Sequence, residues 1–169
     1  MTEYFDKYDK RGAYHWTDYS RESIYKKHAD RVKDWVKGEK ILDIGAGDGL
    51  ITHLLGAEGI ESNDTAVRLA NERKVKVRKG SAYDLTGDYD AVLLGDTLEH
   101  LEFPEKCLKE IRKVLKGTLY ITIPPKGHKC KYDYNNWNAK ELTELVEKQG
   151  FKKVGKISLA NKRLYAKFN

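Results

Sequence analysis

Between Asp43 and Ile51 three glycines stand at every second position, and this pattern constrains the fold more than any other part of the chain. Gly45, Gly47 and Gly49 follow the short apolar segment Ile41-Leu42. Glycine has no Cβ, so the backbone at such a turn can pass very close to a bound molecule. The pattern predicts a strand, a tight turn and then a helix. In an α/β sheet, ligands bind at this place, outside the carboxyl end of the strand.

The spacing of these glycines separates two classes of nucleotide-containing ligand. A dinucleotide site has Gly-x-Gly-x-x-Gly, with the pyrophosphate at a helix amino terminus. The present pattern, Asp43-x-Gly-x-Gly-x-Gly, has one residue fewer before the last glycine. This spacing argues against an NAD-dependent oxidoreductase. It resembles motif I of the class I S-adenosylmethionine-dependent methyltransferases, of the type 11, small-molecule-like kind.

Short apolar runs alternate with amphipathic segments along the rest of the chain. Helices are expected at 23–36, 50–55, from 63 or 64 onward, from 104 to just before Gly117, and at 138–149. Strands are expected at 40–44, 59–61, 75–77, 89–94 and 118–123, with a closing hairpin at 151–159 and 162–168. This alternation predicts one α/β domain, Rossmann-like and doubly wound, with a mostly parallel seven-stranded sheet and an antiparallel C-terminal hairpin. We expect this domain to span 38–169, behind a helical lid segment at 1–37.

Composition limits the classes of protein to consider. The chain has 169 residues, enough for one α/β domain, and no run of 18 apolar residues, so a membrane span is not expected. No signal peptide is visible, and two cysteines are too few for a disulfide framework. A cytoplasmic setting follows as the expectation. The net charge of +6 comes mostly from lysine, which favours a solvated lysine-rich surface. An RNA substrate attracted by this positive charge stays open. Nothing in the sequence sets the oligomeric state.

Further candidate residues end the second and third predicted strands. Glu61 lies 16 residues beyond Gly45 and precedes Ser62. A carboxylate at this position can accept two hydrogen bonds from a ribose diol. After the third strand, the methyltransferase resemblance implies that residues 81–82 hold the adenine. This chain has Ser81, followed by Ala82, where the family commonly has aspartate, so backbone amides or Tyr83 are the substitutes for that contact.

The segment Gly95-Asp96-Thr97-Leu98-Glu99-His100-Leu101 follows the fourth predicted strand. With Pro104 and the helix after it, it is similar to the Leu-Glu-His-Leu motif of small-molecule class I methyltransferases. The resemblance places His100 near the sulfonium of the donor, either as a general base or as a structural residue beneath the loop. A similar site in small-RNA 2′-O-methyltransferases binds a divalent metal. Asp96, Glu99 and His100, with His128 or Asp133, make that the alternative, but the first glutamate is replaced, and we expect no metal.

Two aromatic segments border the predicted site. In this fold the loop 124–137 lies beside the acceptor, where His128 could take a proton and the loop lysines could favour an anionic substrate. In such methyltransferases the chain before the first strand often covers the cofactor, a role that Tyr14 and Trp16 could fill. The alternatives are a mobile polar loop with incidental aromatics at 124–137 and ordinary packing against the sheet for the amino-terminal segment.

These patterns together predict a methyltransferase that uses S-adenosylmethionine and a small-molecule acceptor. The alternatives are a metal-assisted RNA 2′-O-methyltransferase and a non-catalytic S-adenosylmethionine-binding module. His128 and His100 are the candidate catalytic residues. The expected cofactor contacts are Asp43, Gly45, Ala46, Gly47, Glu61, Ser62, Ser81, Ala82, Asp96, Tyr14 and Trp16.

Overall fold

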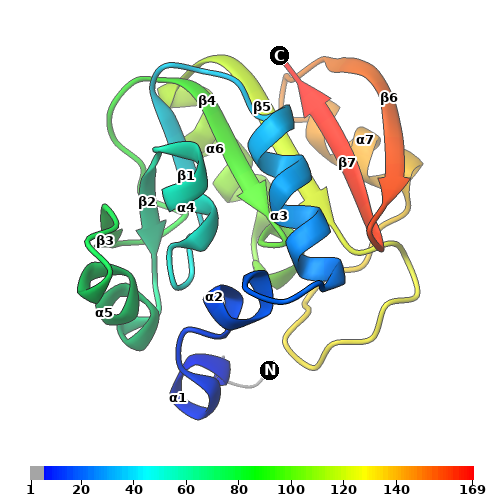
Figure 1. The fold of residues 1–169 in the computed structure, drawn as a ribbon. Helices are drawn as coiled ribbons and strands as arrows, with labels where there is room; N and C mark the ends of the chain where they lie inside the picture. Colours follow the sequence, from blue (N-terminus) through cyan, green and yellow to red (C-terminus); the bar gives the residue numbers. More distant parts are fainter. Residues whose placement is uncertain (1–5) are drawn as a thin grey trace.

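The protein is built around a twisted sheet with the strand order β3-β2-β1-β4-β5-β7-β6 (Figure 1). The computed structural model describes residues 6–169. β7 is antiparallel to both of its neighbours, and the other pairings are parallel. The predicted fold class is therefore confirmed. The strands are β1 (Ile41–Ile44), β2 (Glu58–Glu61), β3 (Val77–Lys79), β4 (Tyr89–Gly95), β5 (Leu115–Ile123), β6 (Lys153–Ala160) and β7 (Arg163–Phe168).

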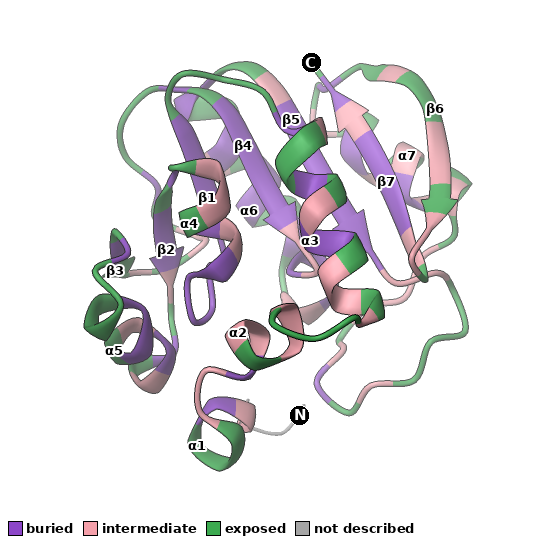
Figure 2. Cartoon of the chain, in the orientation of Figure 1, coloured by how far each residue is buried: buried purple, intermediate pink, exposed green. Residues whose placement is uncertain are grey.

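Helices cover both faces of this sheet (Figure 1). On one face Val32 of α3 and its C-cap residue Val36 belong to one apolar cluster with Leu93 and Tyr120 of the central strands. On the other face α6 and α7 contribute to the largest apolar cluster, and the central strands between the two layers are buried (Figure 2). The helices are α1 (Lys7–Arg11), α2 (Tyr14–Tyr19), α3 (Ile24–Trp35), α4 (Leu50–Leu55), α5 (Asp64–Glu72), α6 (Pro104–Val114) and α7 (Ala139–Glu147), and a short 3-10 turn, η1, spans Leu98–His100.

Side-chain caps fix where three of these helices begin. Ser23 accepts a hydrogen bond from the Lys26 amide at the start of α3, and Asn63 accepts one from Ala66 at the start of α5. At α7 the predicted capping box is present, with Asn138 and Glu141 each bonding the other's backbone amide. Such caps satisfy backbone donors that have no partner within the helix, and each stabilises the helix by about 1 kcal/mol.

Most element boundaries differ from the expectation by one or two residues, and β5 and β3 differ the most. β5 begins at Leu115, directly after α6, so Gly117 lies inside the strand and does not end the helix. A Cβ on Gly117 would overlap the carbonyl oxygen of Asp90, at the place where the register of β4 and β5 shifts. This glycine is therefore required by a bulge. The strand expected at 75–77 lies two residues further along the chain. The Val75 amide donates to the Ala70 carbonyl at the end of α5, and pairing with β2 begins at Val77.

Within residues 6–169, no helix is both long enough and apolar enough to cross a membrane.

Candidate functional site

A cavity of about 680 Å³ opens at the carboxyl ends of the parallel strands. Its wall combines the glycine turn after β1, the end of β2, the loop after β4 and parts of the loop 124–137. Residues of α1, α2 and α3 close it from the amino-terminal side. This is the place where open α/β sheets bind ligands, and the volume is in the range of small-molecule sites.

The glycine turn is held against two neighbouring segments. The amides of Gly45 and Ala46 both donate to the Ile60 carbonyl, at 2.9 and 3.1 Å. Thr97, in the loop after β4, donates its hydroxyl to the Ile44 carbonyl at 3.0 Å. Gly45 has a φ of +76°, and a Cβ on it would overlap the Thr97 side chain. The turn therefore requires glycine here both for its backbone conformation and for space.

Asp43 is a buried carboxylate at the base of this turn. Its Oδ2 accepts a hydrogen bond of 2.7 Å from Thr52, and no lysine or arginine of the described chain pairs with it. Burial raises the pKa of Asp43 to about 6, and the charge of Glu61 adds to the increase. A carboxylate kept at the cavity wall without a basic partner has spare acceptor capacity for a ligand.

Glu61 is fixed in position at the end of β2. Its Oε2 accepts from the Gly47 amide at 2.9 Å and its Oε1 from the Asn63 amide at 2.8 Å. A carboxylate offers about four lone-pair positions, so both oxygens keep capacity toward the cavity. The orientation of an acceptor pair is therefore set by the backbone of the glycine turn before any ligand arrives.

The amino-terminal segment is attached to the same turn. His15 meets the Asp48 carboxylate twice, through its backbone N at 3.0 Å and its Nδ1 at 3.1 Å. The Trp16 indole donates to the Asp48 carbonyl at 2.9 Å. Tyr8 and Tyr14 stack with ring centroids 5.3 Å apart and line the cavity. A Cβ on Gly47 would overlap the Tyr8 hydroxyl. The segment thus covers the turn at close range.

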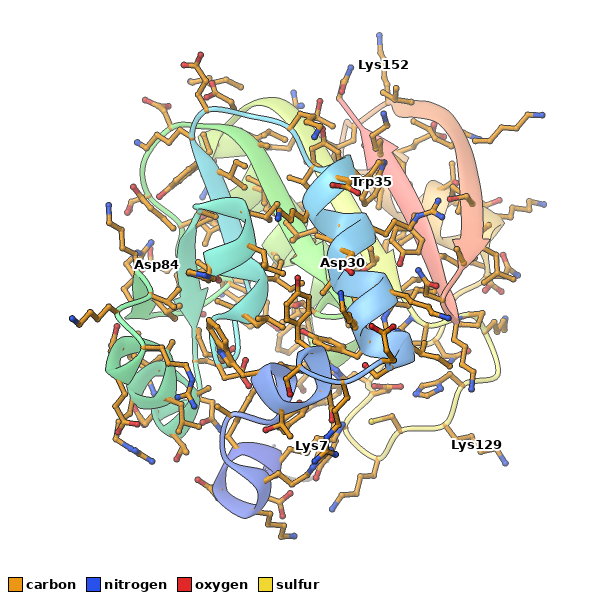
Figure 3. The ribbon with its side chains drawn as sticks, viewed as in Figure 1. Lys7, Asp30, Trp35, Asp84, Lys129 and Lys152 are labelled. Carbon is orange, nitrogen blue, oxygen red and sulfur yellow. The ribbon has the colours of Figure 1, made fainter. Side chains whose placement is uncertain are left out.

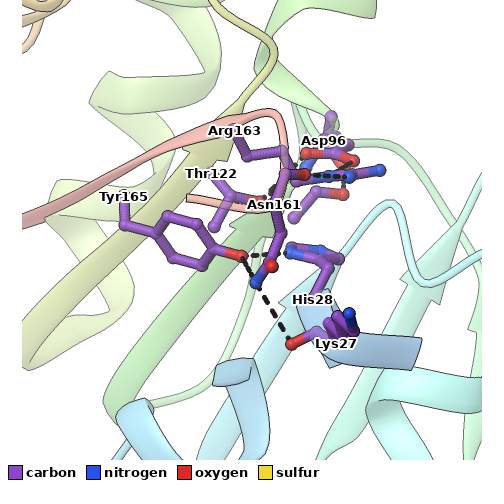
Figure 4. A network of polar contacts seen from close by, with 9 residues as sticks. Lys27, His28, Asp96, Thr122, Asn161, Arg163 and Tyr165 are labelled. Atoms are coloured by element: carbon purple, nitrogen blue, oxygen red, sulfur yellow. Dashed lines mark hydrogen bonds and ion pairs between the residues drawn. The ribbon is translucent and has the colours of Figure 1, made fainter. Parts of the chain in front are cut away.

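A polar network joins the loop after β4 to the C-terminal hairpin (Figure 4). Asp96 has a φ of +50° and accepts from the Thr122 hydroxyl at 3.1 Å and from the Arg163 guanidinium. Burial alone would raise the pKa of Asp96, but the charge and hydrogen bond of Arg163 lower it. Beside this pair, His28 Nδ1 lies 2.8 Å from the Tyr165 hydroxyl.

A second acidic group lies deeper in the loop after β4. Glu99 is 3% exposed, and its Oε2 has no hydrogen-bond partner among residues 6–169. Burial raises the pKa of Glu99 well above its usual range, and the charges of Asp96 and Asp133 add to this. Asp133 Oδ1 lies 2.9 Å from His100 Nδ1, yet neither Asp133 oxygen has a hydrogen bond within the described chain. Burial lowers the pKa of His100, and the Asp133 charge opposes that shift.

The structure brings most of the predicted site residues to one cavity and leaves three out. Gly47 contributes through its amide bond to Glu61, and Ser81 accepts from the Tyr83 amide in a local turn. Trp16 packs outside, on His53 and under Arg73. The predicted residues that line the cavity are Tyr14, Asp43, Gly45, Ala46, Glu61, Ser62, Ala82, Asp96, His100 and His128.

The lysines of the loop 124–137 bear on the acceptor, and the possible metal ligands bear on the metal alternative. Lys126 pairs with Glu141, and Lys129 extends away from the protein (Figure 3). Of the residues 126–131, only His128 and Cys130 line the cavity. No group of three or more His, Cys, Asp or Glu side chains in the described part of the chain is placed to hold a metal ion.

Four residues of the site did not follow from sequence reasoning. Asp48 and Thr97 stand inside the motifs, and their roles depend on contacts with α2 and β1. Tyr8 is one of several aromatic residues in the amino-terminal segment, and its spacing does not distinguish it from the others. Arg163 lies 67 residues from Asp96 in the sequence, and no local pattern connects the two.

Comparison with known proteins identifies the family. Residues 36–162 match the family model described as a methyltransferase domain. Since this match covers most of the chain, the chain belongs to that family, which confirms the class I methyltransferase assignment made from the glycine turn and the later motifs. A protein of uncharacterised function from Methanocaldococcus jannaschii is 29% identical over 171 residues, covering 90% of this chain and 80% of that protein.

Solved structures of more distant sequence share the fold. One is an S-adenosylmethionine-dependent methyltransferase of Thermotoga maritima, described as a possible histamine N-methyltransferase, at 21% identity and a TM-score of 0.74, covering 96% of this chain and 94% of that one. Another is magnesium protoporphyrin IX methyltransferase of Synechocystis with bound S-adenosylhomocysteine, at 15% identity and a TM-score of 0.73, covering 96% and 95%. The acceptors named for these two proteins differ widely, so the fold does not define the acceptor.

Proposed function

We propose that this methyltransferase binds S-adenosylmethionine in the part of the cavity next to β1 and β2 and transfers its methyl group to a small-molecule acceptor. The single observation that carries the proposal is the hydrogen bond by which the Gly47 amide of the glycine turn holds the Glu61 carboxylate at the cavity wall. It fixes an acceptor pair beside the turn before a ligand binds. Bound S-adenosylhomocysteine in the Synechocystis structure supports the choice of donor.

Different residues would bind the amino-acid part, the ribose and the adenine of the donor. Asp43 and the backbone of the glycine turn would hold the amino-acid part, and Glu61 with Ser62 the ribose diol. The adenine would lie by Gly80 and Ala82, both at the cavity wall. When bound, the donor supplies a methyl group already activated by a positively charged sulfur. The protein's contribution is then mainly orientation, which can lower a barrier by roughly 7–11 kcal/mol.

The acceptor would enter on the side of β4 and β5. There the cavity is lined by the loop after β4 and by His128 and Cys130 of the loop 124–137. His100, kept neutral by burial, is the better placed general base, because Asp133 lies beside its Nδ1. Residues 6–37 would act as the lid, held to the glycine turn by Asp48. Enclosure on this side favours a small molecule.

Calorimetric titration with S-adenosylhomocysteine tests the proposal. We expect micromolar affinity, a loss of about tenfold or more in Glu61→Ala because a hydrogen-bonded acceptor pair is removed, and no change in Glu72→Ala. Glu72 is exposed, and among residues 6–169 it pairs with Arg68 of the same helix, α5. Absence of binding, equal binding by both variants, or saturable binding of NADH in its place would contradict the assignment.

A further inference from the structure

The cavity contains two buried carboxyl groups with oxygens that accept no hydrogen bond from residues 6–169. These are Glu99 Oε2 and both oxygens of Asp133, although Asp133 Oδ1 lies 2.9 Å from His100 Nδ1, and the Asp133 side chain is 8% exposed. Both residues line the cavity. Nearly all buried polar atoms in proteins are hydrogen-bonded, so unpartnered ones at a binding site indicate a ligand group that completes them.

The other carboxyl groups of the cavity each meet a partner. Asp43 accepts from Thr52, Glu61 from two amides, and Asp96 from Arg163 and Thr122. Asp18 lies 3.6 Å from the Arg11 guanidinium. Glu99 and Asp133 thus carry the buried carboxyl oxygens of the cavity that accept no hydrogen bond within the described chain. They come from η1 and from the loop 124–137, which is docked on η1 by the amides of residues 134 and 135 bonding the Glu99 carbonyl.

The charge around the pair favours a cationic ligand. The protein as a whole carries +6, but the lysines of the loop 124–137 do not line this wall. Three basic side chains do line the cavity, Lys7, Lys162 and Arg163, against six carboxyl groups, and Arg163 is bonded to Asp96. Removing a carboxylate from water without a basic partner is costly, and a ligand that brings a positive charge and N–H donors offsets that cost.

We propose that the acceptor is a small primary or secondary amine, bound in its protonated form between Glu99 and Asp133. This inference rests on the proposed function and names its substrate class. The ammonium first gives one proton to the neutral ring of His100, which passes it to solvent, and the freed nitrogen lone pair then forms the N–CH₃ bond. The S–CH₃ bond breaks and its electron pair returns to sulfur, leaving a neutral thioether. The methylated amine keeps its positive charge, so one proton is released overall.

The state of Glu99 adds a second readout that does not depend on turnover. Burial raises the pKa of Glu99 well above its usual range, which favours its protonated form in the free protein. A cation placed beside it favours the carboxylate, so amine binding displaces that proton. The charged groups facing Glu99 are Asp96, Asp133 and Arg163. Calorimetry in two buffers of different ionisation enthalpy measures the proton released.

The test compares three probes of the same size that differ in their head group: phenethylamine, 2-phenylethanol and phenylacetate. Each is titrated into the full chain saturated with S-adenosylhomocysteine, up to about 10 mM, so that millimolar dissociation constants are detected. We expect the amine to bind at least about tenfold more tightly than the alcohol and the acid, with proton release. Glu99→Gln and Asp133→Asn should each weaken amine binding about 10- to 100-fold, as for a lost hydrogen bond to a charged group. Glu102→Gln, an exposed neighbour outside the cavity, is the matched control.

The outcomes separate this inference from the proposed function. S-adenosylhomocysteine binding that persists while the three probes bind equally, the acid binds best or none binds overturns the amine assignment alone. A Glu99→Gln variant that loses S-adenosylmethionine affinity but not S-adenosylhomocysteine affinity also overturns it, because the carboxyl would then serve the sulfonium. Loss of S-adenosylhomocysteine binding by the unmodified protein contradicts the proposed function itself. Retained S-adenosylhomocysteine affinity shows that each variant is folded.

Discussion

The imidazole Nδ1 and the backbone N of His15 both meet the carboxylate of Asp48, at 3.1 and 3.0 Å. Asp48 is fully buried between two glycines of the turn after β1, and His15 belongs to α2. Tyr25 of α3 stacks on the His15 ring, with centroids 4.7 Å apart. The pair therefore ties the amino-terminal cover to the turn on which we expect the donor to rest.

Replacing Asp48 by alanine should release this cover. Two donors of His15 lose their acceptor, and each buried donor left unsatisfied costs about 1–3 kcal/mol. We expect the free energy of unfolding in urea to fall by that order, and the His15 amide to exchange with deuterium much faster. Glu72→Gln, which removes only an exposed ion pair of α5, should change stability by less than about 0.5 kcal/mol. Unchanged exchange at His15 in Asp48→Ala would show that the contact does not hold the segment.

Gly45 should tolerate alanine far less well than Gly56. Both have a positive φ, +76° and +62°, so alanine at either position costs about 1–2 kcal/mol in backbone conformation. At Gly56 a Cβ has nothing within 4 Å, whereas at Gly45 it would overlap Thr97. We expect Gly45→Ala to cost about 1–3 kcal/mol more, as for other overpacked sites, and to lose S-adenosylhomocysteine binding. Equal stability of the two variants by urea titration would rule out the steric part of this argument.

Local signals in the sequence were enough for the fold and for most helix boundaries. Leu50–Leu55 was predicted to the residue, because glycines flank it on both sides, and the cap residues Asn63 and Asn138 have the expected hydrogen bonds. The role of Gly117 was wrong, because its meaning depends on the carbonyl of Asp90 on the adjacent strand. A glycine required by a neighbouring strand has the same sequence signature as one that ends a helix.

The site was predictable only where its residues belong to one motif. Asp43, Gly45 and Glu61 end adjacent parallel strands, so topology alone brings them together. The partners that set charge and position come from distant segments: Arg163 for Asp96, and Asp133 for His100. Trp16 shows the converse, since its aromatic character suggested a place over the ligand, while its indole N–H is used on the outer side of the turn. Pairings over such distances arise from tertiary packing and leave no local pattern.

Asp43→Asn should stabilise the free protein while weakening donor binding. The pKa of Asp43 is about 6 in the fold, against its ordinary value of 3.8. Above pH 6 the Asp43 carboxyl is ionised in both states, but its ionisation is less favourable in the folded protein. The charge therefore lowers the free energy of unfolding by about 2–3 kcal/mol. Asparagine keeps an acceptor for Thr52 without the charge. We expect urea unfolding to show this gain at pH 7, shrinking as the pH falls toward 4. A variant less stable than the parent protein at pH 7 would contradict the assignment.

His28 should make the fold sensitive to mild acid in the opposite direction. Burial lowers its pKa from 6.5 to about 4, and it lies 2.8 Å from the Tyr165 hydroxyl as a neutral ring. Between these two values the unfolded chain binds a proton that the folded protein does not. The stability is therefore complete above pH 6.5 and falls by up to about 3 kcal/mol as the pH approaches 4.

The Asp43→Asn background is the right one in which to measure this slope, because Asp43 shifts stability the other way over nearly the same range. The charged and titratable groups near His28 are Asp96, Arg163 and His15, and they stay in place. Between pH 7 and 4.5 the unfolding free energy of Asp43→Asn should fall steadily relative to that of Asp43→Asn/His28→Gln, because Glu99 and the other titratable groups are common to the two variants. Parallel curves for the two would mean that His28 titrates equally in the folded and unfolded chains, and that burial beside Tyr165 does not hold it neutral.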